Sequence, residues 1–94
     1  MLREYKMNKK ELKREEKRIN EILIKSIIAT YSDLTIARKN YEFAEEELID
    51  YYLYEIKANQ AKLNYFIKKA KQKGIELNRI EKIKVEYLEE NQVG

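Results

Sequence analysis

The sequence of 94 residues contains no cysteine, no histidine and no proline, and its only glycine before the C-terminal residue is Gly74. Without cysteine the chain can form neither disulfide bonds nor thiolate metal sites. Small secreted domains often need disulfide bonds, so this absence favours a cytoplasmic location. A β-rich fold needs turn residues at regular intervals, and they are missing here. The many helix-forming residues instead predict an all-α protein.

Long hydrophobic runs are also missing. The longest stretch without a charged residue is residues 26–32, far short of the roughly 20 apolar residues that span a bilayer. The N-terminal residues are charged but are not followed by the apolar segment of a signal peptide. We therefore expect no transmembrane segment. Leucine, isoleucine, valine and phenylalanine make up roughly a quarter of the chain, which is enough to fold a small single domain.

The missing residue types also bear on catalysis. Enzymes usually need a group that changes charge near neutral pH or an activated nucleophile. Ser26 and Ser32 have no histidine to activate them. The glutamates around Glu42–Glu46 lack the histidines that complete di-iron sites in helical bundles, and we interpret them as a solvated helix start. The sequence therefore predicts no enzyme, no cofactor, no metal site and no small-molecule substrate.

The charges that are present are segregated along the chain, although the net charge is only +3. Residues 42–55 carry six acidic groups and no basic one, whereas residues 57–73 carry six lysines and no acid. Acid at the start and base at the end is the order that a helix dipole favours. Gly74 can adopt the left-handed conformation that ends a helix, with Ile75 packing back on Ala70. These features predict a helix over about residues 48–73.

Two apolar stripes follow opposite sides of this predicted helix. The first, at three- and four-residue steps, consists of Ile49, Leu53, Ile56, Leu63, Ile67 and Ala70. The second consists of Tyr51, Tyr54, Ala58, Ala61 and Tyr65. We therefore expect this helix to pack against a different neighbour on each of its two apolar sides.

The preceding segment predicts a longer helix over about residues 9–44. Its main stripe is Leu12, Ile19, Leu23, Ile27, Thr30, Leu34, Ala37, Tyr41 and Ala44. Ile24, Ile28 and Tyr31 lie on other sides of the same helix, so one partner helix cannot cover every apolar residue. A turn near residues 45–47 would give an antiparallel, coiled-coil-like hairpin. The alternative is a single helical rod over residues 9–73 that must dimerise, because glutamates do not break helices.

After Gly74, Asn78 and Glu81 have the spacing of a capping box. Apolar residues follow at helical intervals. They predict a short third helix over about residues 79–90.

Several of these segments together resemble a known family. Residues 40–44 (NYEFA), residues 48–58 (LIDYYLYEIKA) and the closing lysines before Gly74 are similar to the YaaL-like family of Firmicutes. This is a family of short helical proteins of unknown function, and the resemblance covers about residues 15–77. It implies a cytosolic helical protein, and the family's genes tend to lie near those for recombinational repair. Family members often have an Asp-Pro break before the LID run, where this chain has three glutamates.

The leading hypothesis for function is a non-enzymatic protein–protein interaction module that self-associates as a homodimer or binds another protein. The tyrosines could also stack on bases or lie at a membrane surface, but packing against a helix suits them better because alanines lie between them. The candidate interface consists of Ile24, Ile28, Tyr31, Tyr51, Tyr54, Ala58, Ala61 and Tyr65.

An alternative function rests on the basic residues. In an antiparallel hairpin the end of the second helix lies beside the start of the first, which predicts one basic tip. Its residues are Lys10, Lys13, Arg14, Lys17, Lys68, Lys69, Lys71 and Lys73. Such a tip could meet the acidic turn of a second copy, or bind nucleic acid in a DNA-repair context with salt-sensitive affinity. Binding to an anionic membrane surface is a third and weaker hypothesis.

Overall fold

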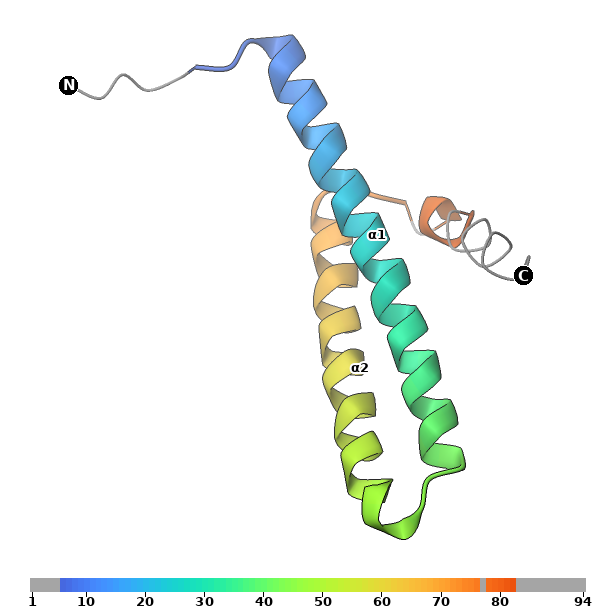
Figure 1. The fold of residues 1–94 in the computed structure, drawn as a ribbon. Coiled ribbons are helices and arrows are strands. Elements are labelled where there is room, and N and C mark those ends of the chain that lie inside the picture. The colour runs from blue at the N-terminus through green and yellow to red at the C-terminus, as the bar shows by residue number, and fades with distance from the viewer. Residues whose placement is uncertain (1–5, 77, 83–94) are drawn as a thin grey trace, which may run out of the picture.

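The chain folds as a hairpin of two long helices. The computed structural model describes residues 6–76 and 78–82. They form α1 (Lys9–Glu42) and α2 (Ile49–Gln72), joined through a short 3-10 helix, η1 (Glu46–Leu48). α1 and α2 run antiparallel and contact each other (Figure 1), and this part of the chain contains no strand. The all-α class and the antiparallel helical hairpin predicted from the sequence are therefore confirmed.

α1 begins at a well-formed cap. The Asn8 side-chain oxygen accepts a hydrogen bond of 2.9 Å from the backbone N–H of Glu11, which satisfies one of the donors that a helix start leaves unpaired. The helix ends at Glu42, two residues before the predicted end at residue 44. The Phe43 backbone, at φ −109° and ψ 13°, has already left the α-helical conformation.

The turn forms without glycine or proline. Glu45 is extended at φ −66° and ψ 151°, and η1 follows it directly. Glu46, Glu47 and Asp50 lie at the start of η1 and α2, where the helix dipole favours negative charge. The turn predicted near residues 45–47 is thus present, and the chain is a hairpin rather than a single rod.

The core of the hairpin follows the main stripe of α1. Leu23, Ile27, Thr30, Leu34 and Ala37 are buried against α2. Leu63 and Ala70 of α2 are buried in return, while Ile56 and Ile67 are partly buried beside them. Burying one leucine or isoleucine side chain stabilises a fold by about 1.5–3 kcal/mol. These contacts therefore hold the two helices together.

The start of α1 extends beyond the end of α2. The first buried residue of α1 is Leu23, and Figure 1 shows the preceding turns of the helix projecting past the last turn of α2. Leu12 and Ile19, which the sequence placed in the packing stripe, are therefore exposed. We call residues 9–22 the N-terminal arm; at 1.5 Å per residue it is about 20 Å long.

Gly74 ends α2 as predicted. It has a φ of +74°, the left-handed region that residues with a Cβ rarely adopt. Its N–H bonds the Lys71 carbonyl at 3.0 Å, and the N–H of Ile75 bonds the Ala70 carbonyl at 3.0 Å. These two bonds define a Schellman motif. Ile75 is buried in the same apolar cluster as Ala70, which confirms the predicted contact.

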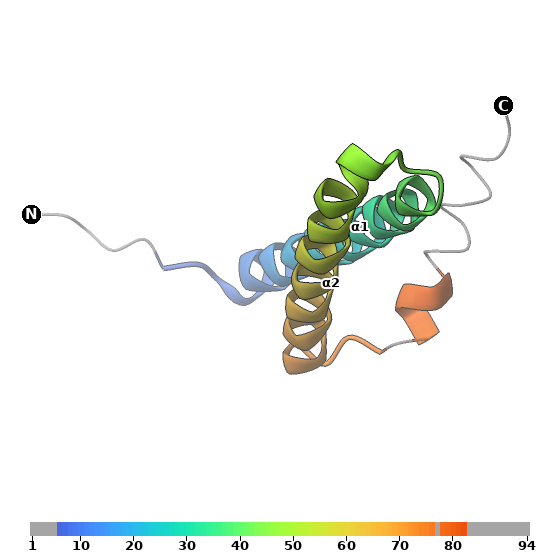
Figure 2. The ribbon, with the colours of Figure 1, turned by 90° about the horizontal axis from the view of Figure 1, so that it is seen from below.

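The chain then turns toward the side of α1. Residues 78–82 are helical (Figure 2), and the Ile80 N–H bonds the Glu76 carbonyl at 3.4 Å. Asn78 therefore lies inside this helix and is not its N-cap, contrary to the prediction. The rest of the predicted helix over residues 79–90 lies outside the described residues.

Within the described part of the chain, no helix has an apolar stretch that could span a bilayer.

Candidate interaction surface

The outer side of α2 carries the second apolar stripe. Because successive residues are rotated by about 100° around a helix axis, this stripe lies nearly opposite Leu63 and Ala70, which face α1. All its members are exposed, and we call them the tyrosine face: Tyr51, Tyr54, Ala58, Ala61 and Tyr65. The three tyrosines are 54%, 70% and 55% exposed. The side of α2 that was predicted from the sequence to contact a partner is thus exposed in the structure.

Neighbouring side chains hold two of these rings in defined positions. Tyr51 meets Tyr52 edge-on, with ring centroids 5.1 Å apart. Tyr65 meets Phe66 in the same way at 5.6 Å, and the Lys69 ammonium lies 5.7 Å from the Tyr65 ring centroid. Edge-to-face rings and cation–π contacts each contribute about 0.5–1.5 kcal/mol. The rings are therefore partly ordered before any partner arrives.

The Tyr51 hydroxyl has a partner of its own. It forms a hydrogen bond with the Glu55 side chain one turn along α2, and this bond, together with the negative charge of Glu55, raises the pKa of Tyr51 above its ordinary value of 10.0. Hydrogen bonding to the neutral phenol and a nearby negative charge both disfavour the phenolate. The phenol is therefore protonated at neutral pH.

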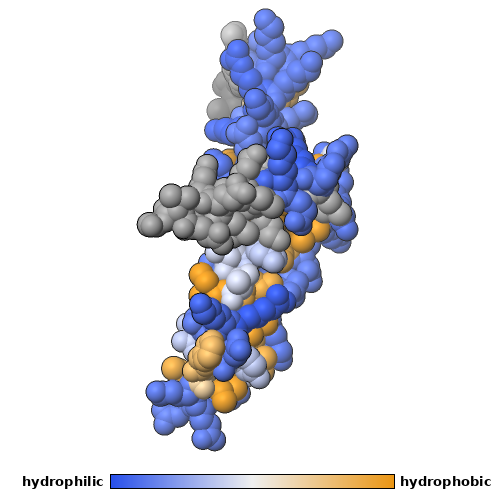
Figure 3. Space-filling model, turned by 90° about the vertical axis from the view of Figure 1, so that its right-hand side faces the viewer, coloured by the Kyte–Doolittle hydropathy of each residue, from blue (hydrophilic) through white to orange (hydrophobic). Residues whose placement is uncertain are grey.

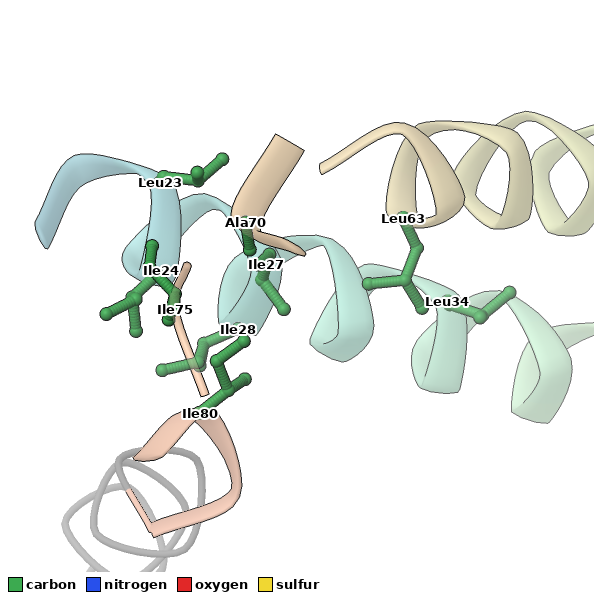
Figure 4. Close-up of a cluster of buried hydrophobic side chains, with 9 residues drawn as sticks. All are labelled: Leu23, Ile24, Ile27, Ile28, Leu34, Leu63, Ala70, Ile75 and Ile80. Atoms are coloured by element: carbon green, nitrogen blue, oxygen red, sulfur yellow. The ribbon is translucent and has the colours of Figure 1, made fainter. Parts of the chain in front are cut away.

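Ile24 and Ile28 are not part of an open surface, which corrects the predicted interface. They are only 2% and 4% exposed. Figure 4 shows Ile75 and Ile80, from the segment after α2, lying against them in one apolar cluster. The prediction was wrong for these two residues because it gave the C-terminal segment no place to pack.

Tyr31 is partly buried at the edge of the same cluster. It lines a small hollow of about 170 Å³ where α1, α2 and the C-terminal segment meet, and the other lining residues are Ile27, Ile28, Leu63, Ile67, Ile80 and Glu81. Tyr31 therefore completes an internal packing site and is separate from the tyrosine face.

The residues of the predicted basic tip do not all lie together, because α1 extends past the end of α2. Lys68, Lys69, Lys71 and Lys73 are exposed on the last turns of α2, whereas Lys10, Lys13 and Arg14 lie along the N-terminal arm. The tip predicted from the sequence is therefore spread over a longer region, because α1 does not end level with α2.

Some basic groups do converge where the arm leaves the hairpin. One hollow of about 320 Å³ is lined by Lys13, Lys17 and Arg79 together with Glu16 and Asn20. A neighbouring hollow of about 220 Å³ is lined by Lys73 with the same glutamate and asparagine. Glu16 therefore places a negative charge among these cations.

An apolar region at the turn was not predicted from the sequence. Phe43 is 75% exposed, and Leu48 is also exposed. They line a hollow of about 370 Å³ with Lys39, Asn40, Ala44, Glu45 and Tyr52. The available signal was a pair of large apolar residues on either side of the expected turn.

The surface view separates the two ends of the molecule. Figure 3, which faces the side where the C-terminal segment lies, shows hydrophobic groups over the lower, turn half of the hairpin, whereas the arm is hydrophilic on this side.

Among residues 6–76 and 78–82, no three acidic side chains are grouped so that they could hold a metal ion.

Comparisons with known proteins identify no relative. No family model, no curated protein and no solved structure matches the chain. The resemblance to the YaaL-like family therefore stays a prediction.

Proposed function

We propose that this protein is a non-enzymatic helical interaction module that binds a polypeptide partner through the tyrosine face of α2. The observation that carries this proposal is the position of Tyr51, Tyr54 and Tyr65: each is more than half exposed on the side of α2 away from α1. Tyrosine is enriched at protein interfaces and among the residues that dominate binding energy.

The chemistry of the face supports this role. A tyrosine ring offers a large apolar area and a polar edge, and it has only two side-chain torsions to order on binding. The ring contacts of Tyr51 and Tyr65 order these side chains further. Ala58 and Ala61 lie between the rings and leave room for another backbone to approach. A partner helix is therefore the ligand that this face fits best.

Two parts of the proposal rest on the sequence. The lack of cysteine in so small a chain is the reason to place the function in the cytoplasm. The segments similar to the YaaL-like family include residues 48–58, which overlap the tyrosine face, so membership of that family would be compatible with this role.

The test is a photo-cross-linking experiment in the cells that make the protein. A benzophenone amino acid replaces Tyr54, or, as the matched control, Ile36, which is 54% exposed on α1. We expect irradiation to convert the 11.4 kDa chain into a discrete heavier species when the probe is at position 54 and not when it is at position 36. Cross-linking at neither position, or equal cross-linking at both, would contradict the proposal.

A second candidate function is binding of nucleic acid. It is supported by the convergence of Lys13, Lys17 and Arg79 around one hollow and of Lys73 around the next. Phosphate groups could contact these cations together with the exposed lysines at the end of α2. Such binding would weaken steeply with salt, because each phosphate contact releases counterions.

A gel-shift assay at low and at moderate salt tests this second function. Changing Lys68, Lys69, Lys71 and Lys73 to glutamate should abolish any shift of short DNA or RNA. Absence of a shift by the unaltered protein at low salt would remove this candidate.

A further inference from the structure

The tyrosine face has the spacing of a coiled-coil seam. Its members follow one another at steps of three, four, three and four residues: Tyr51, Tyr54, Ala58, Ala61 and Tyr65. These steps are the pattern of the a and d positions of a coiled coil, in which two helices pack along one stripe. In the part of the chain that the structure describes, the seam is exposed and lies on the side of α2 away from α1. α1 therefore does not obstruct a second helix along this seam.

Charged residues flank the seam on both sides. In heptad notation they occupy the e and g positions, which in a coiled coil contact the partner helix and set its direction and alignment. The e residues are Glu55 and Lys62, and the g residues are Asp50, Lys57, Asn64 and Lys71. All of them belong to α2 and are exposed or partly exposed. Their charges can therefore be compared with each way of placing a second α2 on the face.

A parallel arrangement of two α2 helices is opposed by these charges. In parallel coiled coils each g residue lies beside the e residue five positions later in the other helix. This would place Asp50 beside Glu55 of the second copy, and Lys57 beside its Lys62. Both contacts join like charges, which disfavours the arrangement.

One antiparallel alignment fits the shapes of the side chains along the seam. When Ala58 lies level with Ala61 of the second copy, Tyr54 lies level with its Tyr65. The alanine layers at the centre let the two helices approach closely, and a pair of tyrosine rings packs on either side of them. Tyr51 lies level with Lys68, a cation that can rest on its ring. Every member of the tyrosine face is thus covered.

The same alignment brings opposite charges together. In antiparallel coiled coils e residues lie beside e residues, and g residues beside g residues. Glu55 then meets Lys62 of the second copy, and Asp50 meets its Lys71. Each contact occurs twice, because the arrangement is symmetric.

Alignments shifted by one heptad lose this complementarity. A shift in one direction places Glu55 against Glu55 of the second copy, and a shift in the other direction places Lys62 against Lys62. Pairs as exposed as these contribute little affinity, but they select among alternative alignments. The flanking charges therefore specify one antiparallel alignment.

We propose that the partner of the tyrosine face is the tyrosine face of a second copy of this chain, with the two α2 helices antiparallel. A two-fold axis passes between the alanine layers, and the α1 helix of each copy lies on the outer side of the pair. Each copy uses its whole face, so the dimer is closed and does not extend into a filament. This inference rests on the proposed function and names its partner.

A charge exchange tests the dimer without altering the seam. Glu55→Lys and Lys62→Glu, each alone, set like charges against each other at both e contacts. We expect each variant to dimerise about ten-fold more weakly than the native chain in sedimentation equilibrium. An equimolar mixture of the two should recover native affinity, because every e contact again joins opposite charges.

Asp33→Lys is the matched control for this experiment. It makes the same change of charge at an exposed position of α1 and should leave dimerisation unchanged. Because the seam is only about 20 Å long, we expect a weak and reversible dimer, and the measurement extends to about 1 mM protein. Circular dichroism checks that each variant remains helical.

Cysteine cross-linking measures the alignment, since the natural chain contains no cysteine. Full-length Tyr54→Cys and Tyr65→Cys are mixed in equal amounts and oxidised. The two positions lie level in the proposed dimer, whereas each lies about 16 Å along the helix from its own counterpart, too far for a disulfide. We expect the mixed disulfide to form about ten times faster than either homodimer disulfide.

The outcomes separate this inference from the proposed function. A native chain that is monomeric at about 1 mM, or a mixture of charge variants that associates no better than each alone, would overturn the second copy as partner. Homodimer disulfides that form faster than the mixed one would overturn the antiparallel alignment.

Photo-cross-linking from position 54 in cells distinguishes the two proposals. A product of twice the mass of the chain supports both of them. A product of any other mass supports the interaction module and overturns the second copy as its partner. The absence of a product removes the proposed function and this inference with it.

Discussion

α1 and α2 each carry a second apolar face besides the one that they bury against each other, and the described residues of the chain cover only one of the two. On α1 this face contains Ile24 and Ile28, which the segment after Gly74 seals with Ile75 and Ile80. On α2 it contains Tyr51, Tyr54 and Tyr65, which stay more than half exposed. The covered face is aliphatic, whereas the open face is built from residues that tolerate both water and a partner.

This comparison shows that a surplus of apolar positions in a sequence does not by itself define an interface. Some of the surplus apolar residues pack within the chain and others form an open surface. Only the chemistry and the position of each residue distinguish these two groups. The comparison can be tested by substitutions on each face, in order of decreasing expected effect.

The largest effect is expected for Ile24→Ala on the covered face. The side chain is 2% exposed, so its loss removes buried area and leaves a cavity. We expect the free energy of unfolding to fall by about 2–5 kcal/mol, measured by urea denaturation followed by circular dichroism. A loss below about 1 kcal/mol would mean that the C-terminal segment does not seal this face.

An intermediate effect is expected for Gly74→Ala, which alters the direction of that segment. Nothing lies within 4 Å of the position that a Cβ would take, so only the positive φ of +74° opposes the substitution. An L-residue in this conformation costs about 1–2 kcal/mol. Urea denaturation should show that loss, and Gly74→Asn should show a smaller one, since asparagine visits the left-handed region more readily. An unchanged stability in the alanine variant would contradict the Schellman motif.

A small effect on stability is expected for Tyr54→Ala on the open face. Tyr54 is 70% exposed, and substitutions at such sites usually change the free energy of unfolding by less than about 0.5 kcal/mol. The measurement is made at low protein concentration, where self-association contributes nothing to stability. A loss comparable to that of Ile24→Ala would show that the tyrosine face is part of the core.

The smallest effect concerns pH. The bond to Glu55 raises the pKa of Tyr51 in the folded state above 10.0, its value in an unfolded chain. The resulting stabilisation is therefore fully present below pH 10 and is lost as the pH rises through the folded-state pKa. Ultraviolet absorbance titration should show one tyrosine ionising at lower pH in Glu55→Gln than in the natural protein. In a Tyr51→Phe protein, the Glu55→Gln substitution should no longer change the titration curve. If it still lowers the pH at which a tyrosine ionises, the affected tyrosine is not Tyr51.

The features predicted correctly are those with local causes. The end of α2 depends on lysines, Gly74 and Ile75 within a few positions, and all of its elements are present. The tyrosine face follows from helical periodicity alone, because residues on one stripe share a direction wherever the helix lies. The turn near residues 45–47 followed from charge order, although local propensity alone would also allow a continuous helix.

The features that were missed depend on contacts between distant segments. The burial of Ile24 and Ile28 requires the direction that the chain takes after Gly74, which no local pattern specifies. The exposure of Leu12 and Ile19 follows from the difference in length between two helices, and their spacing alone resembles a core stripe. The separation of the basic groups on the arm from those on α2 has the same cause.

The order of segments along the chain has a consequence for synthesis on the ribosome. The residues that seal α1 come last: Ile75 and Ile80 follow both helices that they pack against. The aliphatic side of the hairpin can therefore be covered only once the segment after Gly74 has also been synthesised. A premature stop codon after Gln72 would leave both helices in the chain and Ile24 and Ile28 without the residues that cover them.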